Sequence, residues 1–479
     1  MSYANGVHPC LYRPDFEKDN CGFGLIAHMD GMSSHWLVET AIKALNRLTH
    51  RGAIAADGKT GDGSGILIKK PDGFLRRIAS EQGFSLKRSY AVGCVFLNPD
   101  QTRAQQARET LARELAADGL EVAGWRIVPT DHAALGEEAL KSVPHIEQVF
   151  VNAPDGIDLA SFERRLFTAR RRSEKALRDD PVFYVPSLSS RVLSYKGLVM
   201  PANLPVFYRD LSDPRLETAL AIFHQRFSTN TWPQWRLAQP FRFLAHNGEI
   251  NTIRGNRNWA NARAHKFSTP LIPNMDDVRP LVSSDGSDSC SLDNMLDVML
   301  AGGIDIFRAM RLLIPPAWQN VDSMDADLRA FYEYNSMHTE PWDGPAGIVL
   351  TDGRYAACCS DRNGLRPARW VITRDRHITL ASEVGVWDYE PTDVVAKGRI
   401  RPGEMFAVDT ETGVILQPDD IDARLKNRHP YKKWLQRYAV ELGSKLAAQD
   451  TDRIECNDAQ ALIYQKMFNV SMEERNQVI

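Results

Sequence analysis

Apolar residues along the chain follow two periods, and each period predicts a different kind of element. A spacing of three to four residues predicts an amphipathic helix over 37–48, which Ser33 or Ser34 can cap. The same spacing predicts helices at about 101–118 and 159–178. Short unbroken apolar runs bounded by Gly, Asn or Asp predict buried strands, at about 21–28, 66–68, 90–97, 219–223 and 243–246.

The pattern changes in the last third of the chain. Residues 348–350 and 354–359 predict an antiparallel strand pair around a Thr-Asp-Gly turn, and short strands continue to about 408. After roughly 415 the composition becomes charged and helical, at 432–446 and 458–468. The chain stops at Ile479 after a helical pattern without a cap, which we interpret as a truncation point.

Composition narrows the class of protein. Among 479 residues, 43% are hydrophobic, 25% are charged and the net charge is −3, which is typical of a globular protein without affinity for nucleic acid. There is no signal-peptide core and no apolar run of about 18 residues, so we expect neither secretion nor a membrane span. Seven scattered cysteines without a CxxC pair indicate a cytoplasmic protein without disulfides or a metal cluster.

Two polar stretches receive structural interpretations. The run Arg170-Arg171-Arg172 falls on a predicted helix, and a charge run of this kind predicts a solvated helix face. The glycine-rich turn at 60–65 is similar to a phosphate-binding loop only superficially, because the Lys-Ser ending and the following helix are missing. We therefore interpret it as a turn at the edge of a sheet.

Cys21 follows a charged leader of twenty residues and opens an apolar strand. A thiolate attacks acyl carbons well, but a free thiol has a pKa of about 8.5 and needs a base. If the bond before Cys21 were cut, the new α-amine, with a pKa of roughly 7.7–8.0, could take that proton. Taken alone, the stretch favours an inert buried cysteine.

Three further segments carry polar groups with two interpretations each. Arg226 precedes a loop of hydroxyls and aromatic rings, which suits an amino-acid carboxylate or an ordinary surface arginine. Asn247-Gly248 is a hairpin signal, but an amide beside a glycine N–H can also stabilise an oxyanion. In residues 283–289, one side chain should cap a helix that begins near Ser291, and another could hold an ammonium group.

Six short blocks occur in a fixed order along the chain. They are Cys21-Gly22-Phe23-Gly24, His50-Arg51-Gly52, Gln225-Arg226-Phe227-Ser228-Thr229, His246-Asn247-Gly248, Ser287-Asp288-Ser289 and Asp361-Arg362-Asn363-Gly364-Leu365-Arg366-Pro367. No single block is specific, but the ordered set resembles the class II glutamine amidotransferases. The long insertion at about 70–215 resembles the large-subunit branch of the bacterial glutamate synthases within that family.

The resemblance implies a fold class and a domain organisation. The fold would be α+β, a four-layer αββα sandwich of two mostly antiparallel sheets flanked by helices, of the N-terminal-nucleophile hydrolase type, with a helical C-terminal segment. Residues 1–20 would form a propeptide and 21–412 the amidotransferase domain. Residues 413–479 would begin the central domain of a glutamate synthase.

The resemblance also implies a mechanism and a set of residues. After removal of the propeptide, Cys21 would attack the side-chain amide of L-glutamine, release ammonia and later glutamate, and use its own α-amine as the base. Asn247 and Gly248 match the oxyanion hole. The substrate-binding residues implied are Arg226 for the α-carboxylate, Asp288 for the α-ammonium group, Thr229 in the same block as Arg226, and Arg51 as an organiser of the site.

One departure from the family pattern concerns two side chains. Many class II members have Trp and His where this chain has Phe227 and Asn230, although the glutamate synthase branch resembles this chain there. The departure puts these two side chains in question as contacts, and leaves Arg226 unaffected.

In the whole enzyme that the resemblance implies, ammonia would pass to a downstream synthase domain that converts 2-oxoglutarate to glutamate with FMN and an iron–sulfur cluster. We expect no cofactor within residues 1–479, because the cysteines lack cluster spacing. The implied partners are the downstream domain, a small (beta) subunit and further copies in an oligomer. The alternatives are another class II amidotransferase, such as a phosphoribosyl-pyrophosphate or asparagine-forming enzyme, and a non-catalytic module that kept the fold.

Overall fold

The computed structural model describes residues 21–226, 233–440 and 456–477. The chain forms two compact units, and the boundary between them falls between Lys432 and Lys433. The second unit contains α13 (Asp458–Met467) and α14 (Met472–Gln477). The propeptide and the domain boundary at 412 stay predictions.

The first sheet of the larger unit has seven strands, all antiparallel to their neighbours, and it places Cys21 at the end of a central strand. All seven residues of β1 are buried, because strands lie on both sides of it and side chains cover both of its faces. The strand order is β14 (Val394–Arg399), β12 (Arg369–Thr373), β13 (His377–Ala381), β1 (Gly22–His28), β8 (Leu220–Gln225), β2 (Ser64–Lys69) and β7 (Val192–Gly197).

The second sheet packs face to face against the first. Phe23 and Ile222 from the first sheet share one apolar core with Ala245, Val349 and Cys358 from the second. This core fixes the distance between β1 and the strand that carries Asn247. The strand order of the second sheet is β16 (Val414–Leu416), β15 (Met405–Asp409), β11 (Tyr355–Ser360), β10 (Ala346–Leu350) and β9 (Leu244–Gly248).

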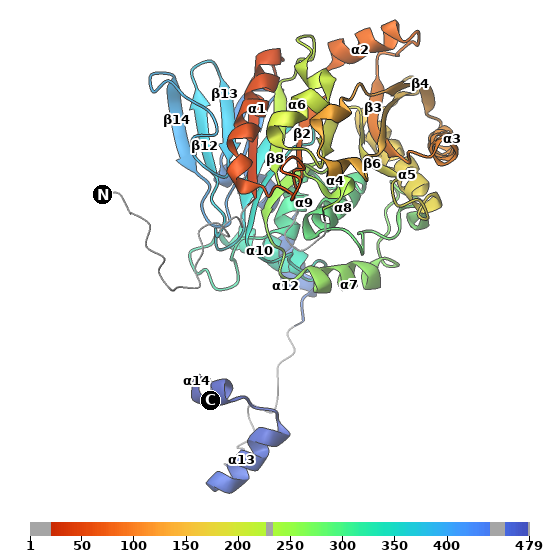
Figure 1. Ribbon diagram of the computed structural model, residues 1–479. Helices are drawn as coiled ribbons and strands as arrows, with labels where there is room; N and C mark the ends of the chain where they lie inside the picture. Colours follow the sequence, from red (N-terminus) through yellow and green to blue (C-terminus); the bar gives the residue numbers. More distant parts are fainter. Residues whose placement is uncertain (1–20, 227–232, 441–455, 478–479) are drawn as a thin grey trace. The chain divides into compact units, whose positions relative to one another are not determined.

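Helices cover the outer faces of both sheets (Figure 1). Ser34 caps α1 (His35–Arg47), and the apolar stripe of α1 joins a core with Ile66 and Phe223 of the first sheet. Phe307 of α9 (Ile306–Leu313) contacts Tyr355 on the outer face of the second sheet. The prediction of a four-layer αββα sandwich is therefore confirmed. The other helices of the second outer layer are α8 (Asp288–Ala301), α10 (Ala326–Ser336) and α11 (Pro418–Lys426). In the sequence, α7 (Ile253–Arg263) follows β9 and α12 (Tyr431–Tyr438) follows α11.

Although β7 lies within the 70–215 insertion and belongs to the first sheet, the rest of the insertion forms a third antiparallel sheet with its own helices. Its strand order is β4 (Glu121–Ile127), β5 (His145–Asn152), β3 (Tyr90–Leu97) and β6 (Tyr184–Ser189). One face packs against α3 (Gln101–Ala117) and α5 (Leu159–Ala176), which the periodicity predicted nearly to the residue. The remaining helices of this region are α2 (Asp72–Glu81), α4 (Glu137–Leu140) and α6 (Leu204–Phe207).

Three sequence predictions need correction. The arginine run is not a solvated face, because Arg170 is only 2% exposed and its Nη2 lies 2.5 Å from Asp297 Oδ2 in α8. The glycine-rich turn at 60–65 was predicted at the edge of a sheet, but it leads into β2, which is an interior strand. The helix predicted at 432–446 covers only Tyr431–Tyr438 within the described residues.

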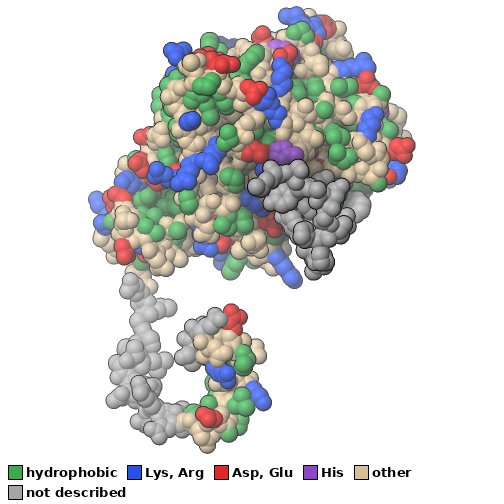
Figure 2. Space-filling model, turned by 60° about the vertical axis from the view of Figure 1, so that its left-hand side comes forward, with side chains coloured by type: hydrophobic (Ala, Val, Ile, Leu, Met, Phe, Trp, Pro, Cys, Tyr) green, Lys and Arg blue, Asp and Glu red, His purple; other side chains and the backbone are tan. Residues whose placement is uncertain are grey.

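Charge on the surface follows the composition. Figure 2 shows Lys and Arg interspersed with Asp and Glu over the visible face of the described residues. No described helix combines the length and the apolar character needed to cross a bilayer.

Candidate active site

Three neighbouring interior strands begin or terminate at the same end of the first sheet and bring three site residues together. Gln225, the last residue of β8, pairs with Gly22 on one side and with Ser64 on the other. Cys21 precedes Gly22 and Arg226 follows Gln225, so antiparallel pairing places them side by side. Asp62 lies just before β2 at the same end of the sheet.

Cys21 is nearly buried, with 7% of its surface exposed. Burial raises the pKa of its thiol to about 12, opposed by Arg226 and Arg366 and reinforced by Asp62 and Asp288. The thiol is therefore protonated near neutral pH, and a base must remove its proton before it can act as a nucleophile. Four charged side chains thus surround the sulfur at a distance where their fields matter.

Arg226 is held through its backbone and its side chain. Its φ of +85° is rare for a residue with a side chain, and its N–H donates to Gly63 O at 2.8 Å. Its Nε lies 3.6 Å from Asp62 Oδ2. A non-glycine residue in this conformation persists only when its surroundings enforce it, as they often do at ligand sites.

Asn247 and Gly248 come from the second sheet. They end β9, where they pair with Gly347 and Ala346 of β10, so the Asn-Gly dipeptide is not a tight hairpin turn. Asn247 is buried, and among the described residues no donor reaches its Oδ1. Gly248 has a φ of +149°, and a Cβ there would lie 1.8 Å from Pro345 O. Glycine is thus required at this position.

Contact between the two sheets brings Asn247 toward Cys21. Gly347, which pairs with Asn247, packs so closely on Phe23 that a Cβ would lie 3.0 Å from the ring. Phe23 is two residues from Cys21. The sandwich therefore brings together the Cys21 thiol from one sheet and the Asn247 amide from the other.

Asp288 lies in the first turn of α8, which Ser287 caps by accepting a hydrogen bond from Cys290 N at 3.0 Å. The helix therefore begins three residues before the predicted Ser291. The Asp288 carboxylate is 8% exposed and accepts from Ile250 N at 2.8 Å. Because a helix N-terminus is electropositive, it attracts the negative end of a side chain placed here.

A hydrogen bond links α8 to the strand that carries Asn247. Ser289 Oγ lies 2.8 Å from His246 Nδ1, and both side chains are buried. Gln239 also donates to His246 O and accepts from His246 N. These contacts fix Asp288 relative to the end of β9.

Arg51 is linked to the Cys21 strand through Glu383. Its Nε and Nη2 donate to the two carboxylate oxygens of Glu383, at 3.2 and 2.8 Å. The neighbouring Ser382 bonds to the backbone of Phe23 through its N–H and its Oγ. The chain of contacts from Arg51 to the Cys21 strand therefore runs through Glu383 and its neighbour Ser382. The other predicted residues of this region, Thr229, Phe227 and Asn230, lie outside the described residues.

Sequence reasoning gave no role to two charged residues of this site. Asp62 stands in the glycine-rich turn, where only its position beside β8 reveals its contact with Arg226. Arg366 belongs to one of the six ordered blocks, and its Cβ packs within 3.3 Å of the position of a Cβ on Gly347. The carboxylate of Asp361 shapes that block by accepting from Asn363 N and Leu365 N.

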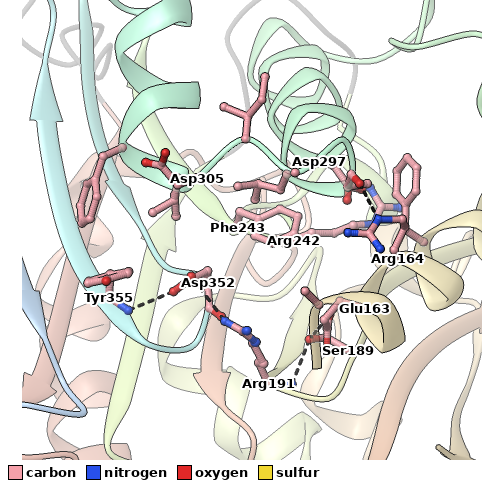
Figure 3. Close-up of a pocket in the computed structure, with 18 of the residues that line it drawn as sticks. Glu163, Arg164, Ser189, Arg191, Arg242, Phe243, Asp297, Asp305, Asp352 and Tyr355 are labelled. Carbon is pink, nitrogen blue, oxygen red and sulfur yellow. Dashed lines mark hydrogen bonds and ion pairs between the residues drawn. The ribbon is translucent and has the colours of Figure 1, made fainter. Parts of the chain in front are cut away.

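A separate cavity of about 630 Å³ lies between α5, α8, α9 and α11, and it contains none of the predicted site residues. Several of its arginines pair with carboxylates, and Figure 3 shows Arg191 directed at Asp352 and Arg242 beside Asp297. Arg164 instead donates to the backbone carbonyl of Ala301. Among the described residues, no three His, Cys, Asp or Glu side chains are grouped to hold a metal ion.

The comparison with known families agrees on one class. The family model described as "Glutamine amidotransferases class-II" matches residues 21–434. The large chain of glutamate synthase [NADPH] from Bacillus subtilis is 39% identical over 97% of this chain and 30% of its own length, and that from Azospirillum brasilense is 40% identical over 98% and 31%. Ferredoxin-dependent glutamate synthase 2 of Synechocystis is 38% identical over 99% of this chain and 31% of its own length. The chain thus spans about a third of these relatives.

Proposed function

The chain belongs to the class II glutamine amidotransferases, and we propose on that basis that it hydrolyses L-glutamine to glutamate and ammonia with Cys21 as the nucleophile. One observation carries the proposal. The ends of β1 and β8, the turn before β2 and the start of α8 place Arg226, Asp62 and Asp288 within electrostatic reach of one buried thiol. An isolated structural cysteine has no need of such surroundings.

The proposed reaction begins after cleavage of the bond between Asn20 and Cys21. The freed α-amine takes the thiol proton, and Sγ attacks the side-chain carbonyl carbon of glutamine. The C–N bond then breaks, the proton goes to the departing nitrogen, and ammonia leaves a γ-glutamyl thioester. Water attacks the thioester and the C–S bond breaks, so that glutamate is released and the Cys21 thiol is regenerated. The burial that raises the pKa of Cys21 to about 12 supports the need for a base this close.

Binding roles follow from charge and position. Arg226 would hold the α-carboxylate of the substrate as a bidentate partner, and Asp288 would hold its α-ammonium group. The Asn247 amide and the Gly248 N–H would donate to the oxyanion that develops on the side-chain carbonyl. Arg51 would stabilise the Cys21 strand through Glu383, and Thr229 would contact the substrate from the block that follows Arg226.

The proposal extends to a longer protein. The relatives' names describe glutamate synthases, and this chain spans about a third of their length. We propose that the ammonia is used by a downstream synthase domain that aminates 2-oxoglutarate, with FMN and an iron–sulfur cluster there and a small subunit as partner. The relatives include NADPH-dependent and ferredoxin-dependent enzymes, and the proposal covers either electron donor.

Labelling with an electrophilic glutamine analogue tests the glutaminase proposal. The purified protein is incubated with 6-diazo-5-oxo-L-norleucine, and peptide mapping locates the label while intact-mass analysis locates the N-terminus. We expect one label, on the sulfur of a Cys21 that carries a free α-amine, and no label in Cys21→Ala. Glutamine hydrolysis by a protein that retains residues 1–20, or hydrolysis that survives Cys21→Ala, would contradict the mechanism.

A further inference from the structure

Asp62, just before β2, and Arg226, just after β8, form an ion pair beside Cys21. Asp62 is 7% exposed, and its Oδ2 lies 3.6 Å from Arg226 Nε. Oδ2 also accepts from Ala53 N at 3.0 Å, which further fixes the carboxylate. The packing around it is tight, since a Cβ on Gly52 would lie 3.2 Å from Asp62 Oδ1.

The backbone holds the two residues in register as well. Arg226 N donates to Gly63 O at 2.8 Å, and Asp62 N donates to Ala53 O at 3.2 Å. The segment that contains Gly52 and Ala53 is therefore coupled to the end of β8 through Asp62.

The effect of Asp62 on the nucleophile is unfavourable. Its negative charge disfavours the thiolate of Cys21, whereas Arg226 favours it. A carboxylate that hinders thiolate formation must contribute elsewhere if it is useful to the site. A guanidinium carries five donors, so an arginine with one carboxylate 3.6 Å from its Nε can bind a second carboxylate through its terminal nitrogens.

We propose that Asp62 is a positioning residue that aims Arg226 at the α-carboxylate of the substrate and so determines selectivity for ligands that carry this group. The inference rests on the proposed function in one respect, the assignment of Arg226 to the substrate carboxylate. It adds a residue of the glycine-rich turn to the recognition of that carboxylate.

Binding measurements separate positioning from chemistry. Titration calorimetry on Cys21→Ala compares L-glutamine with 4-aminobutanamide, which lacks the α-carboxylate, with and without Asp62→Asn. We expect Asp62→Asn to weaken glutamine binding about 10- to 100-fold, because a displaced guanidinium loses its bidentate grip, and to leave 4-aminobutanamide within about twofold. In the enzyme with Cys21 intact, the same substitution should raise KM by a similar factor and change kcat less than about threefold.

Asp57→Asn is the matched control. Asp57 lies in the same loop, and its carboxylate accepts from Lys59 N and Thr60 N of that loop. The control should leave the affinity for both ligands within about twofold. An unchanged glutamine affinity in Asp62→Asn, or an equal loss for both ligands, would overturn the positioning role. Failure of the wild-type protein to hydrolyse glutamine would instead contradict the proposed function, since the binding comparison does not need turnover.

Discussion

Two carboxylates of the larger unit, the buried Asp62 and the half-buried Glu174, differ in how their surroundings affect their charge. Burial raises the pKa of Asp62, beside Cys21, to about 6, and the Ala53 N–H and Arg226 compensate only in part. Burial acts on Glu174 of α5 as well, yet the arginines around it lower its pKa to about 2. Arg226 lies 3.6 Å from Asp62, whereas three arginines reach Glu174 at 2.7–3.0 Å, namely Arg170, Arg171 and Arg242.

The contrast separates a stabilising charge from a destabilising one. The folded-state pKa of Glu174 lies below its ordinary value of 4.5, so Glu174 adds stability at neutral pH that is lost as the pH falls from 4.5 through about 2. The folded-state pKa of Asp62 lies above its ordinary value of 3.8, so the folded state loses stability as the pH rises from 3.8 through about 6. We interpret Glu174 as a support for the fold and Asp62 as a group kept for ligand binding.

The largest expected effect breaks the stabilising half of the comparison. Glu174→Gln leaves three guanidinium groups without their shared carboxylate and should lower the free energy of unfolding by about 3–5 kcal/mol. Urea unfolding measures this, and the KM for glutamine should change less than about threefold. The exposed Glu109→Gln on α3 is the control and should stay within about 0.5 kcal/mol of wild type. A Glu174 variant as stable as wild type would show that the arginines find other partners.

A second substitution tests a carboxylate of the site that faces the proposed substrate. Asp288→Ala should raise the KM for glutamine roughly 30- to 1,000-fold, through loss of an ion pair worth about 2–4 kcal/mol if it is desolvated. Steady-state kinetics measures the change. Ser287→Ala, one residue away, removes the α8 cap and should cost about 1 kcal/mol of stability with little change in KM. An unchanged KM in Asp288→Ala would remove this residue from the site.

The smallest expected effect has the opposite sign. Asp62→Asn should raise the free energy of unfolding by about 2–3 kcal/mol at pH 8, because the amide avoids the burial penalty of the charge, and most of this gain should vanish by pH 4. Urea unfolding at both pH values measures it. Asp57→Asn should instead lose stability, since hydrogen bonds to Thr60 hold the pKa of Asp57 well below its usual range. A stability loss in Asp62→Asn would mean that its contact with Arg226 outweighs the burial.

Local signals in the sequence predicted several helices and strands, and long-range pairing explains two of the errors. The 3.6-residue period located α1, α3 and α5 because each buries one stripe against a sheet. The same reasoning was wrong about Arg170, because its partner Asp297 comes from α8, more than a hundred residues later. Charge alone cannot distinguish a solvated arginine from one that meets a carboxylate inside the fold.

The same contrast between local signals and long-range pairing applies to the site. Ordered blocks pointed to Cys21, Arg226 and Asp288, which the structure brings together, while their catalytic roles stay predictions. Asp62 was missed because its importance arises only when β2 pairs with β8. A glycine-rich turn read by itself contains no information about the strand that will lie beside it.

The position of β1 between β8 and β13 also has a consequence for protein synthesis. The ribosome makes the Cys21 strand first, but its two neighbours in the sheet end at Gln225 and Ala381. At about 5–20 residues per second, roughly 20–70 s pass before β13 has been translated. During that interval β1 lacks first both and then one of its two partners, and the surroundings of Cys21 described above are incomplete. If the chain cuts its own Asn20–Cys21 bond, the sheet thus acts as a timer that delays activation until the whole domain has been made.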